Sequence, residues 1–164
     1  MTFEVIDNFL SDYHFKQIQN VMMGDNFPWF YNNHTVDLGD KKSMFTHTFF
    51  SIDPPWNGNR SSFFPLWENC LQKLRCHQLF RIKANLHLRT IFHRNSGYHT
   101  DYKNIKTAIL YMNTCNGYTK LKKGGKVKSV ANRMLIFDSD LEHAGFTCTD
   151  EQNRVVVNFN YMEL

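Results

Sequence analysis

The sequence predicts a mostly β fold (α+β) of the sandwich, barrel or jelly-roll type. Short strand-like runs recur at intervals of about ten residues between positions 80 and 162, and turn signals separate them. No helical pattern is visible after about residue 77. The chain is also rich in aromatic residues, with 15 phenylalanines, seven tyrosines and three tryptophans among 164 residues, which suits a β-rich core.

The N-terminal part mixes strands and helices. Residues 3–6 fit a short strand, and Ser11 is placed to cap a helix over 12–23 that Gly24 ends. Aromatic runs at 27–31 and 44–50 predict strands joined by a polar loop at 32–43, and an apolar stripe predicts a second helix near 61–76. We expect these helices to pack outside a sheet and to take no part in chemistry.

The C-terminal part carries the repeating strands. They are expected over residues 80–92, 98–103, 106–113, 118–121, 126–130, 133–138, 142–147 and 154–162. We therefore expect one domain over 1–164, in which 1–79 supplies helices and an extension of the sheet and 80–164 forms the β core.

Charge and targeting signals exclude several classes of protein. The formal net charge of +4 is mild, and part of it lies in a lysine cluster between 120 and 128. Such a cluster is typical of a solvated hairpin tip, with a patch for an anionic substrate as the alternative, and it is too local to indicate nucleic acid. The N-terminus lacks signal-peptide features, and no apolar run approaches the ~20 residues of a membrane span.

The four cysteines show no CxxC or zinc-ribbon spacing, which is typical of free thiols in a reducing compartment. We therefore expect a cytoplasmic protein, in the host cytoplasm if it is viral, with no membrane partner. The sequence leaves the oligomeric state open.

Candidate metal ligands lie near the Gly97 turn. His99 and Asp101 are two residues apart at the head of the expected strand 98–103, and side chains at i and i+2 share one face of a strand. His143 is the one histidine after Asp101 and follows a strand and a turn. Together they make a two-histidine, one-carboxylate triad, the usual binding set for non-heme Fe(II). The alternative for His143 is an ordinary surface or capping histidine.

A cation is expected at the far end of the pocket. Such a triad leaves coordination positions open for a bidentate 2-oxo acid, whose distal carboxylate needs a positive partner. Arg154 opens the last strand, and alternation places it on one face with Val156, Asn158 and Asn160. Arginine suits this role because its planar fork matches a carboxylate. The alternative is an edge salt bridge of little energetic value.

These four residues occur in the order and spacing of the Fe(II)/2-oxoglutarate-dependent dioxygenases, and residues 107–113, 117–121 and 132–139 resemble strand motifs of that family. The chain resembles its prolyl 4-hydroxylase-like branch, and residues 3–11 and 81–86 are similar to short members found in phage and marine metagenomic sequences. The resemblance implies a double-stranded β-helix (a jelly roll, cupin-like) with two or three N-terminal helices packed outside the major sheet.

The resemblance also implies roles. His99, Asp101 and His143 would bind Fe(II), and Arg154 would bind the 5-carboxylate of 2-oxoglutarate with help from Tyr111 and Asn158. The protein would use O2 to hydroxylate a peptidyl residue, proline being the family default, or a small molecule, with release of succinate and CO2. The carboxylate of Asp101 favours hydroxylation over halogenation. One departure is Val156, which replaces a serine often found two residues after the basic residue.

Further residues are candidates for the substrate pocket. Asn85 and Arg89 share one face of the strand before the HxD turn, with a polar edge strand as the alternative. Arg94 and Tyr98 lie beside the turn itself, and Trp29 is expected either to wall the entrance or to pack in the core. Two other functions stay open: a non-catalytic jelly-roll binding module with a vestigial metal site, and a nucleic-acid demethylase of the same fold.

Overall fold

Two antiparallel β-sheets face each other in the computed structural model of the chain, which describes residues 3–40 and 42–164. Within these ranges the larger sheet contains, in spatial order, β1 (Phe3–Ile6), β8 (Met134–Asp138), β5 (Lys106–Tyr111), β10 (Asn153–Glu163), β4 (Cys76–Leu88), β3 (Met44–Ser51) and β2 (Phe30–Asn32). The smaller sheet contains β7 (Gly125–Lys128), β6 (Tyr118–Leu121) and β9 (His143–Phe146).

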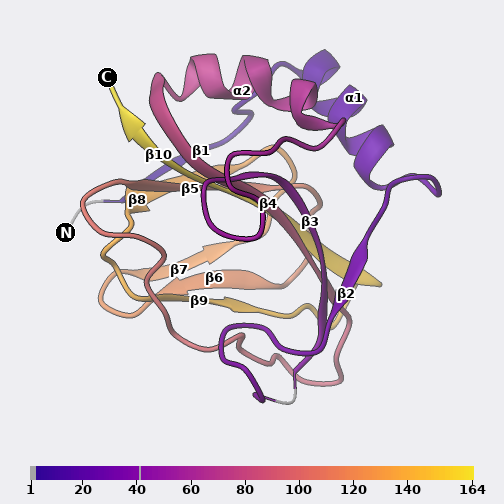
Figure 1. Ribbon diagram of the computed structural model, residues 1–164. Coiled ribbons are helices and arrows are strands. Elements are labelled where there is room, and N and C mark those ends of the chain that lie inside the picture. Colours follow the sequence, from indigo (N-terminus) through magenta and orange to yellow (C-terminus); the bar gives the residue numbers. More distant parts are fainter. Residues whose placement is uncertain (1–2, 41) are drawn as a thin grey trace.

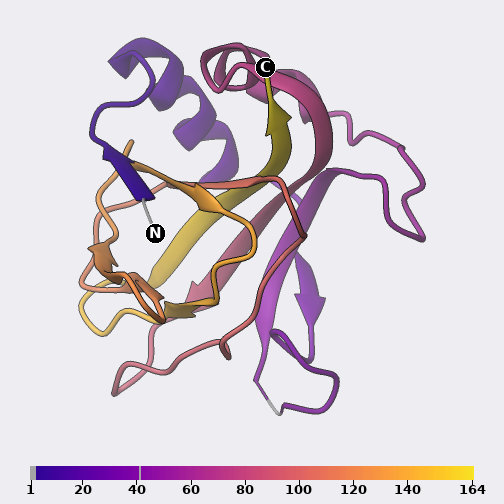
Figure 2. The same cartoon turned by 90° about the vertical axis from the view of Figure 1, so that its left-hand side faces the viewer.

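The helices and the smaller sheet lie on opposite faces of the larger sheet (Figure 1). Figure 2 shows the same layers from the side, with the segment that follows β2 projecting beyond the end of the sheet. Strands β1, β2 and β3 come from the N-terminal part of the chain and lie at the two edges of the larger sheet. The mostly β fold with helices outside the major sheet is confirmed.

Helix α1 (Asp12–Met22) forms where the sequence predicts it. The backbone N–H of His14 donates to Ser11 Oγ at 3.3 Å, which satisfies one of the free donors at the helix start. Phe15, Ile18 and Met22 are buried against the sheet. This apolar face holds the helix in place, because a helix of this length has little stability alone.

The second predicted helix is shorter than expected. Residues 61–76 contain a 3₁₀ turn, η1 (Phe64–Trp67), followed by α2 (Glu68–Lys73). Pro65 lies at the start of η1, and the chain leaves the helix through Arg75, whose φ of 52° lies in the left-handed region. Residues 74–76 therefore turn the chain into β4 instead of extending the helix.

One predicted strand is wrong. Residues 98–103 form no strand; only His99 pairs with the backbone of His143, through hydrogen bonds of 3.0 and 3.1 Å. Beyond His99 the segment is held by the side chain of Asp101, as described below. The strand expected over 80–92 runs instead over Cys76–Leu88; the strand predicted over 118–121 is observed with the same bounds, and the ends of the other predicted strands of the β core lie within two residues of the observed ones.

The main core lies between the helices and the larger sheet. Trp67 is fully buried there, and its ring centroid lies 5.1 Å from that of Phe49 and 5.3 Å from that of Phe159. Alternate residues of β10, namely Val155, Val157 and Phe159, face this core. The opposite face of β10 is therefore directed between the two sheets, because successive side chains alternate.

The four cysteines are free thiols. No helix in the described part of the chain is long and apolar enough to cross a membrane.

Asn132 ties the N-terminal segment to the sheet. It has a φ of 63° in the turn before β8, and its side chain accepts from Leu10 N–H at 2.9 Å and donates to Leu10 O at 2.8 Å. Both groups are buried. An Asn132→Ala variant leaves them without partners and keeps the left-handed backbone, so its free energy of unfolding should fall by about 3 kcal/mol in urea denaturation.

Asn57→Ala is the matched control, because Asn57 is exposed and has a φ of 49°. It should lose only about 1 kcal/mol, the effect of the left-handed backbone alone. Equal losses in the two variants would mean that the Leu10 hydrogen bonds contribute nothing.

Candidate metal centre

Three predicted metal ligands meet between the two sheets. One ligand atom each of His99, Asp101 and His143 lies within 4.8 Å of the other two. His99 Nε2 is 3.7 Å from Asp101 Oδ1, and His143 Nε2 is 3.9 Å from Asp101 Oδ2. His143 is the first residue of β9, and the backbone bridge to His99 brings the two rings to a centroid distance of 4.5 Å. The arrangement suits a single metal ion.

The two histidines are oriented for metal binding. Nδ1 of His99 lies 3.1 Å from Gly97 O, and Nδ1 of His143 lies 3.1 Å from Leu141 O. A carbonyl only accepts, so Nδ1 must carry the hydrogen and Nε2 must carry the lone pair. Burial also lowers the pKa of His143, which favours the neutral ring that a metal ion requires.

Asp101 is fixed by three side chains. Arg81 Nη2 donates to Oδ1 at 2.9 Å, while Thr107 Oγ1 and Asn160 Nδ2 donate to Oδ2 at 3.2 and 3.0 Å. Burial alone would raise the pKa of Asp101, but the Arg81 guanidinium and the other partners lower it to about 2. The carboxylate is therefore ionised. These contacts replace a strand ladder, which is why Asp101 is held although residues 98–103 form no strand.

A cavity of about 350 Å³ opens beside the triad. Its walls include alternate residues of two neighbouring strands: Arg81, Lys83, Asn85 and His87 of β4, and Arg154, Val156 and Asn158 of β10. The predicted alternation of β10 is thus observed, with Arg154 on the cavity side. Asp101 is the one acidic residue among the described residues that line this cavity.

Arg154 is a buried cation without a carboxylate partner. Its side chain is 1% exposed; Nε donates to Ser129 Oγ at 2.8 Å and Nη2 donates to Thr119 Oγ1 at 3.0 Å. No acidic side chain in the described residues forms an ion pair with it. Burying an unpaired charge is strongly unfavourable, and burial lowers the pKa of Arg154. The site is therefore built to receive an anion.

Two glycines make room for this arginine. A Cβ atom at Gly117 would lie 2.5 Å from Arg154 Cδ, and one at Gly145 would lie 3.3 Å from Arg154 Nη1. Gly117 therefore tolerates no side chain while Arg154 keeps this position. The sequence motif at 117–121 thus has a physical reason in the packing around Arg154.

Tyr111 lies next to Arg154, with its ring centroid 5.5 Å from the guanidinium carbon. Its hydroxyl is buried and has no hydrogen-bond partner in the part of the chain that the structure describes. Burial raises the pKa of Tyr111, so the hydroxyl keeps its proton and can donate to an anion. Asn158 Oδ1 and Asn85 Oδ1 are likewise buried and unpaired there. Because these three groups belong to residues that line the cavity or lie next to Arg154, a bound molecule could satisfy them.

No protein-family model and no curated protein matches this sequence, but solved structures do. An oxidoreductase of the 2OG-Fe(II) oxygenase family from Burkholderia pseudomallei superposes with a TM-score of 0.71 at 10% identity, over 98% of this chain and 84% of that chain. The non-heme alpha ketoglutarate dependent epimerase from nogalamycin biosynthesis gives 0.65 at 10% identity, over 98% and 77%. The viral collagen prolyl hydroxylase of Paramecium bursaria Chlorella virus-1, in its 2OG complex, gives 0.61 at 12% identity, over 100% and 97%.

This chain has the fold of the 2OG-Fe(II) oxygenases. The predicted double-stranded β-helix is therefore confirmed, and so is the resemblance to these oxygenases at the level of the fold. Within this oxygenase fold the chain carries the intact His99-x-Asp101, His143 triad. At identities of 10–12%, the comparison establishes architecture and leaves the substrate open.

The oxygenase fold does not bring every predicted pocket residue to the cavity. Arg89 lies past the end of β4 and is exposed, and Arg94 is exposed beside a neighbouring hollow. Tyr98 is 36% exposed and does not line the cavity. Trp29 packs against the main core with its ring centroid 5.1 Å from that of Phe27, which supports the core-packing alternative. Of the five, Asn85 lines the cavity.

Several site residues were not singled out from the sequence: Arg81, Lys83, Thr107, Thr119, Ser129 and Asn160. For two of them a signal exists. Arg81 and Lys83 continue the inner face of β4 that already includes Asn85. Thr119 and Ser129 come from the smaller sheet and its edge, so only tertiary structure brings them to Arg154.

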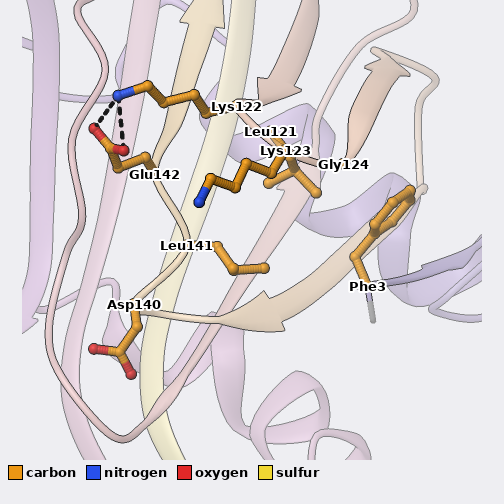
Figure 3. Close-up of a pocket in the computed structure, with 8 residues that line it drawn as sticks. All are labelled: Phe3, Leu121, Lys122, Lys123, Gly124, Asp140, Leu141 and Glu142. Atoms are coloured by element: carbon orange, nitrogen blue, oxygen red, sulfur yellow. Dashed lines mark hydrogen bonds and ion pairs between the residues drawn. The ribbon is translucent and has the colours of Figure 1, made fainter. Parts of the chain in front are cut away.

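The lysine cluster lies outside this cavity. Its members, Lys120, Lys122, Lys123, Lys126 and Lys128, are exposed around the β6–β7 hairpin, which supports the solvated-tip interpretation. A small hollow of about 90 Å³ lies nearby. Figure 3 shows the Lys122–Glu142 ion pair, at 2.8 Å, on one side of it and Phe3 on the other. The charge of Lys122 is therefore already paired with Glu142.

A second group of metal-type ligands, Cys115, Cys148 and Asp150, is less suited to an ion. Both oxygens of Asp150 accept from the backbone N–H of Asn116 at 3.0 Å. Burial raises the pKa of Cys148 to about 11, which disfavours the thiolate that a metal ion needs. The HxD triad is therefore the better metal site.

The buried, neutral His87 should make the stability of the protein decrease as the pH falls. It lies opposite Arg154 across β4 and β10, and burial together with the Arg154 charge lowers its pKa to about 4. The unfolded chain binds a proton at His87 below about pH 6.5, whereas the folded protein does not until about pH 4. The free energy of unfolding should therefore decrease by up to about 3 kcal/mol as the pH is lowered from about 6.5 to about 4.

A His87→Gln variant should show a shallower fall in urea denaturation series over this pH range. His77→Gln, at an exposed position of the same strand, is the control and should keep the wild-type slope. A His87→Gln slope equal to that of the wild type would contradict the burial of a neutral His87.

Proposed function

We propose that this protein is an Fe(II)- and 2-oxoglutarate-dependent dioxygenase that hydroxylates a peptidyl residue or a small molecule and releases succinate and CO2. The observation that carries the proposal is the joint presence of the triad and the unpaired, buried Arg154 in one cavity. A binding module with a vestigial metal site has no need for both features. The fold shared with the 2OG-Fe(II) oxygenases supports the same conclusion.

His99, Asp101 and His143 would hold the metal ion. Two neutral nitrogens and one carboxylate are a donor set suited to Fe(II), and Nδ1 of each histidine is already committed to a carbonyl. Bound Fe(II) supplies the oxidation chemistry with O2 and 2-oxoglutarate. Because the carboxylate ligand Asp101 is present, hydroxylation is favoured over halogenation.

Arg154 would bind the 5-carboxylate of 2-oxoglutarate. Its remaining N–H groups can form the paired hydrogen bonds that a carboxylate prefers, and the Tyr111 hydroxyl next to it can donate a further one. Asn158, on the same face of β10, is placed between Arg154 and the Asn160 that holds Asp101. Val156 offers no hydroxyl group to this carboxylate, so Tyr111 or Asn158 would supply the hydrogen bond of the serine that Val156 replaces.

The class of substrate has two candidates. Proteins with this fold include a viral collagen prolyl hydroxylase and an epimerase of nogalamycin biosynthesis, so fold alone favours neither a peptide nor a small molecule. Proline in a peptide is the default of the resembled branch. Succinate formation with proline-containing peptides and with small molecules as substrates distinguishes the two classes.

The proposal predicts binding and turnover. The protein should bind Mn(II) and then 2-oxoglutarate in calorimetric titrations, and with Fe(II) and O2 it should form succinate, faster when a substrate is present. His143→Ala should abolish metal binding, because it removes one of three ligands. Arg154→Met should keep metal binding and weaken 2-oxoglutarate binding by at least about 30-fold, since it removes the charged partner of a buried carboxylate.

Arg154→Met should also keep or raise the melting temperature of the ligand-free protein, because it removes an unpaired buried charge. The exposed Arg60→Met is the matched control and should leave 2-oxoglutarate affinity unchanged. Absence of any 2-oxoglutarate binding to the Mn(II)-loaded wild type would contradict the dioxygenase assignment. If Arg154→Met loses metal binding as fully as His143→Ala does, the role given to Arg154 is wrong.

A further inference from the structure

A second cation lines the cavity without a partner. Lys83 lies on the inner face of β4, between Arg81 and Asn85 in the alternation. Its ammonium group makes no hydrogen bond or ion pair with any residue that the structure describes. Arg81, the neighbouring cation, is already paired with Asp101 at 2.9 Å. Lys83 is thus a free positive charge in the cavity.

The charge of the cavity stays positive after the proposed ligands bind. Three basic side chains, Arg81, Lys83 and Arg154, and one acidic side chain, Asp101, line it. A divalent metal ion and the dianion of 2-oxoglutarate cancel each other, so they leave this excess unchanged. Arg154 receives the 5-carboxylate and Arg81 keeps Asp101. Lys83 is then the cation whose counter-ion must come from another molecule.

Its place in the sheet puts Lys83 close to the metal position. Across β4 and β10, His87 lies opposite Arg154 at one end and Arg81 lies opposite Asn160, which holds Asp101, at the other. Lys83 lies opposite Asn158 between them, two residues (about 7 Å along the strand) from the row that fixes the metal ligand. An anion at Lys83 therefore lies next to the reacting centre.

Two neutral amides flank this position. Asn85 is two residues from Lys83 on the same face of β4, and Asn158 is its cross-strand neighbour; both line the cavity, and each side chain carries an NH2 group that can donate hydrogen bonds. Burial, assisted by Arg81, lowers the pKa of Lys83 to about 8, so holding the charge here is unfavourable without a counter-ion. The ammonium group and the two amide NH2 groups can donate hydrogen bonds to a single carboxylate.

We propose that the substrate carries a carboxylate that binds Lys83 between Asn85 and Asn158. The inference rests on the proposed function and deepens it, because it names the substrate class: an acidic molecule, or a peptide with an acidic group next to the hydroxylated carbon. Lys83 is then a specificity-determining residue. A neutral analogue of the substrate leaves Lys83 unpaired and binds more weakly for that reason.

Acetate and its neutral isostere acetamide test the site directly. The protein is loaded with Mn(II) and N-oxalylglycine, which occupies the Arg154 end, and Mn(II)-induced broadening of the methyl proton signal reports binding near the metal. Acetate should be broadened and acetamide should not. Lys83→Met should weaken acetate binding by about tenfold or more, as expected for loss of a charged hydrogen bond.

Lys120→Met is the matched control, because it removes one positive charge from an exposed site outside the cavity. It should leave acetate broadening at the wild-type level. Circular dichroism checks that both variants are folded. Lys83→Met should also keep its affinity for N-oxalylglycine within about twofold, since the proposed ligand of Lys83 is not the cosubstrate.

Three outcomes would overturn the inference about Lys83. Acetamide broadened as strongly as acetate, or acetate broadening that survives in Lys83→Met, means that Lys83 does not bind the anion. A tenfold loss of N-oxalylglycine affinity in Lys83→Met means that Lys83 serves the cosubstrate. Failure of N-oxalylglycine to bind the wild type counts against the proposed function instead, and the acetate comparison with Mn(II) in an Arg154→Met background, where the other free cation is absent, then decides the role of Lys83.

Discussion

The burial of Arg154 without a counter-ion is the constraint on which the site depends. Hydroxyls of Ser129 and Thr119 hold two of its N–H groups, and Gly117 and Gly145 leave the space that its stem and head occupy. These contacts join β10 to the smaller sheet across the cavity. They satisfy two of the hydrogen-bond donors of Arg154 but leave its positive charge without a counter-ion. The apolar core beneath β10 must therefore supply the stability that the buried charge costs.

Strand β10 also sets the distance between the anion site and the metal site. Arg154 opens its inner face, and Asn160, six residues later on the same face, donates to Asp101. One rigid element therefore fixes both ends of the cavity, while His143 and His99 complete the metal site from the opposite side through their backbone pairing. The outer face of β10, buried under α1 and α2, prevents this element from shifting. Catalytic geometry and core packing thus share one strand.

The alternation of side chains along a strand made the inner face of β10 and part of the metal site predictable from the sequence. It placed Arg154, Val156, Asn158 and Asn160 on one face, and the spacing of His99, Asp101 and His143 identified the triad. It failed where side chains replace backbone ladders: residues 98–103 are held through Arg81, Thr107 and Asn160, and no local pattern encodes that. Trp29 packs in the main core and Arg89 lies in solvent past the end of β4, although both are predicted as pocket residues. The sequence alone does not show which face of the sheet Trp29 lies on, or that β4 ends before Arg89.

A crystal structure of the protein with Mn(II) and 2-oxoglutarate tests the central claim most directly. The account predicts one metal ion bound by His99 Nε2, Asp101 and His143 Nε2, with the 5-carboxylate of 2-oxoglutarate paired to the Arg154 guanidinium. Density for 2-oxoglutarate elsewhere, or a metal ion held without these three residues while Arg154 stays unpaired, would contradict it.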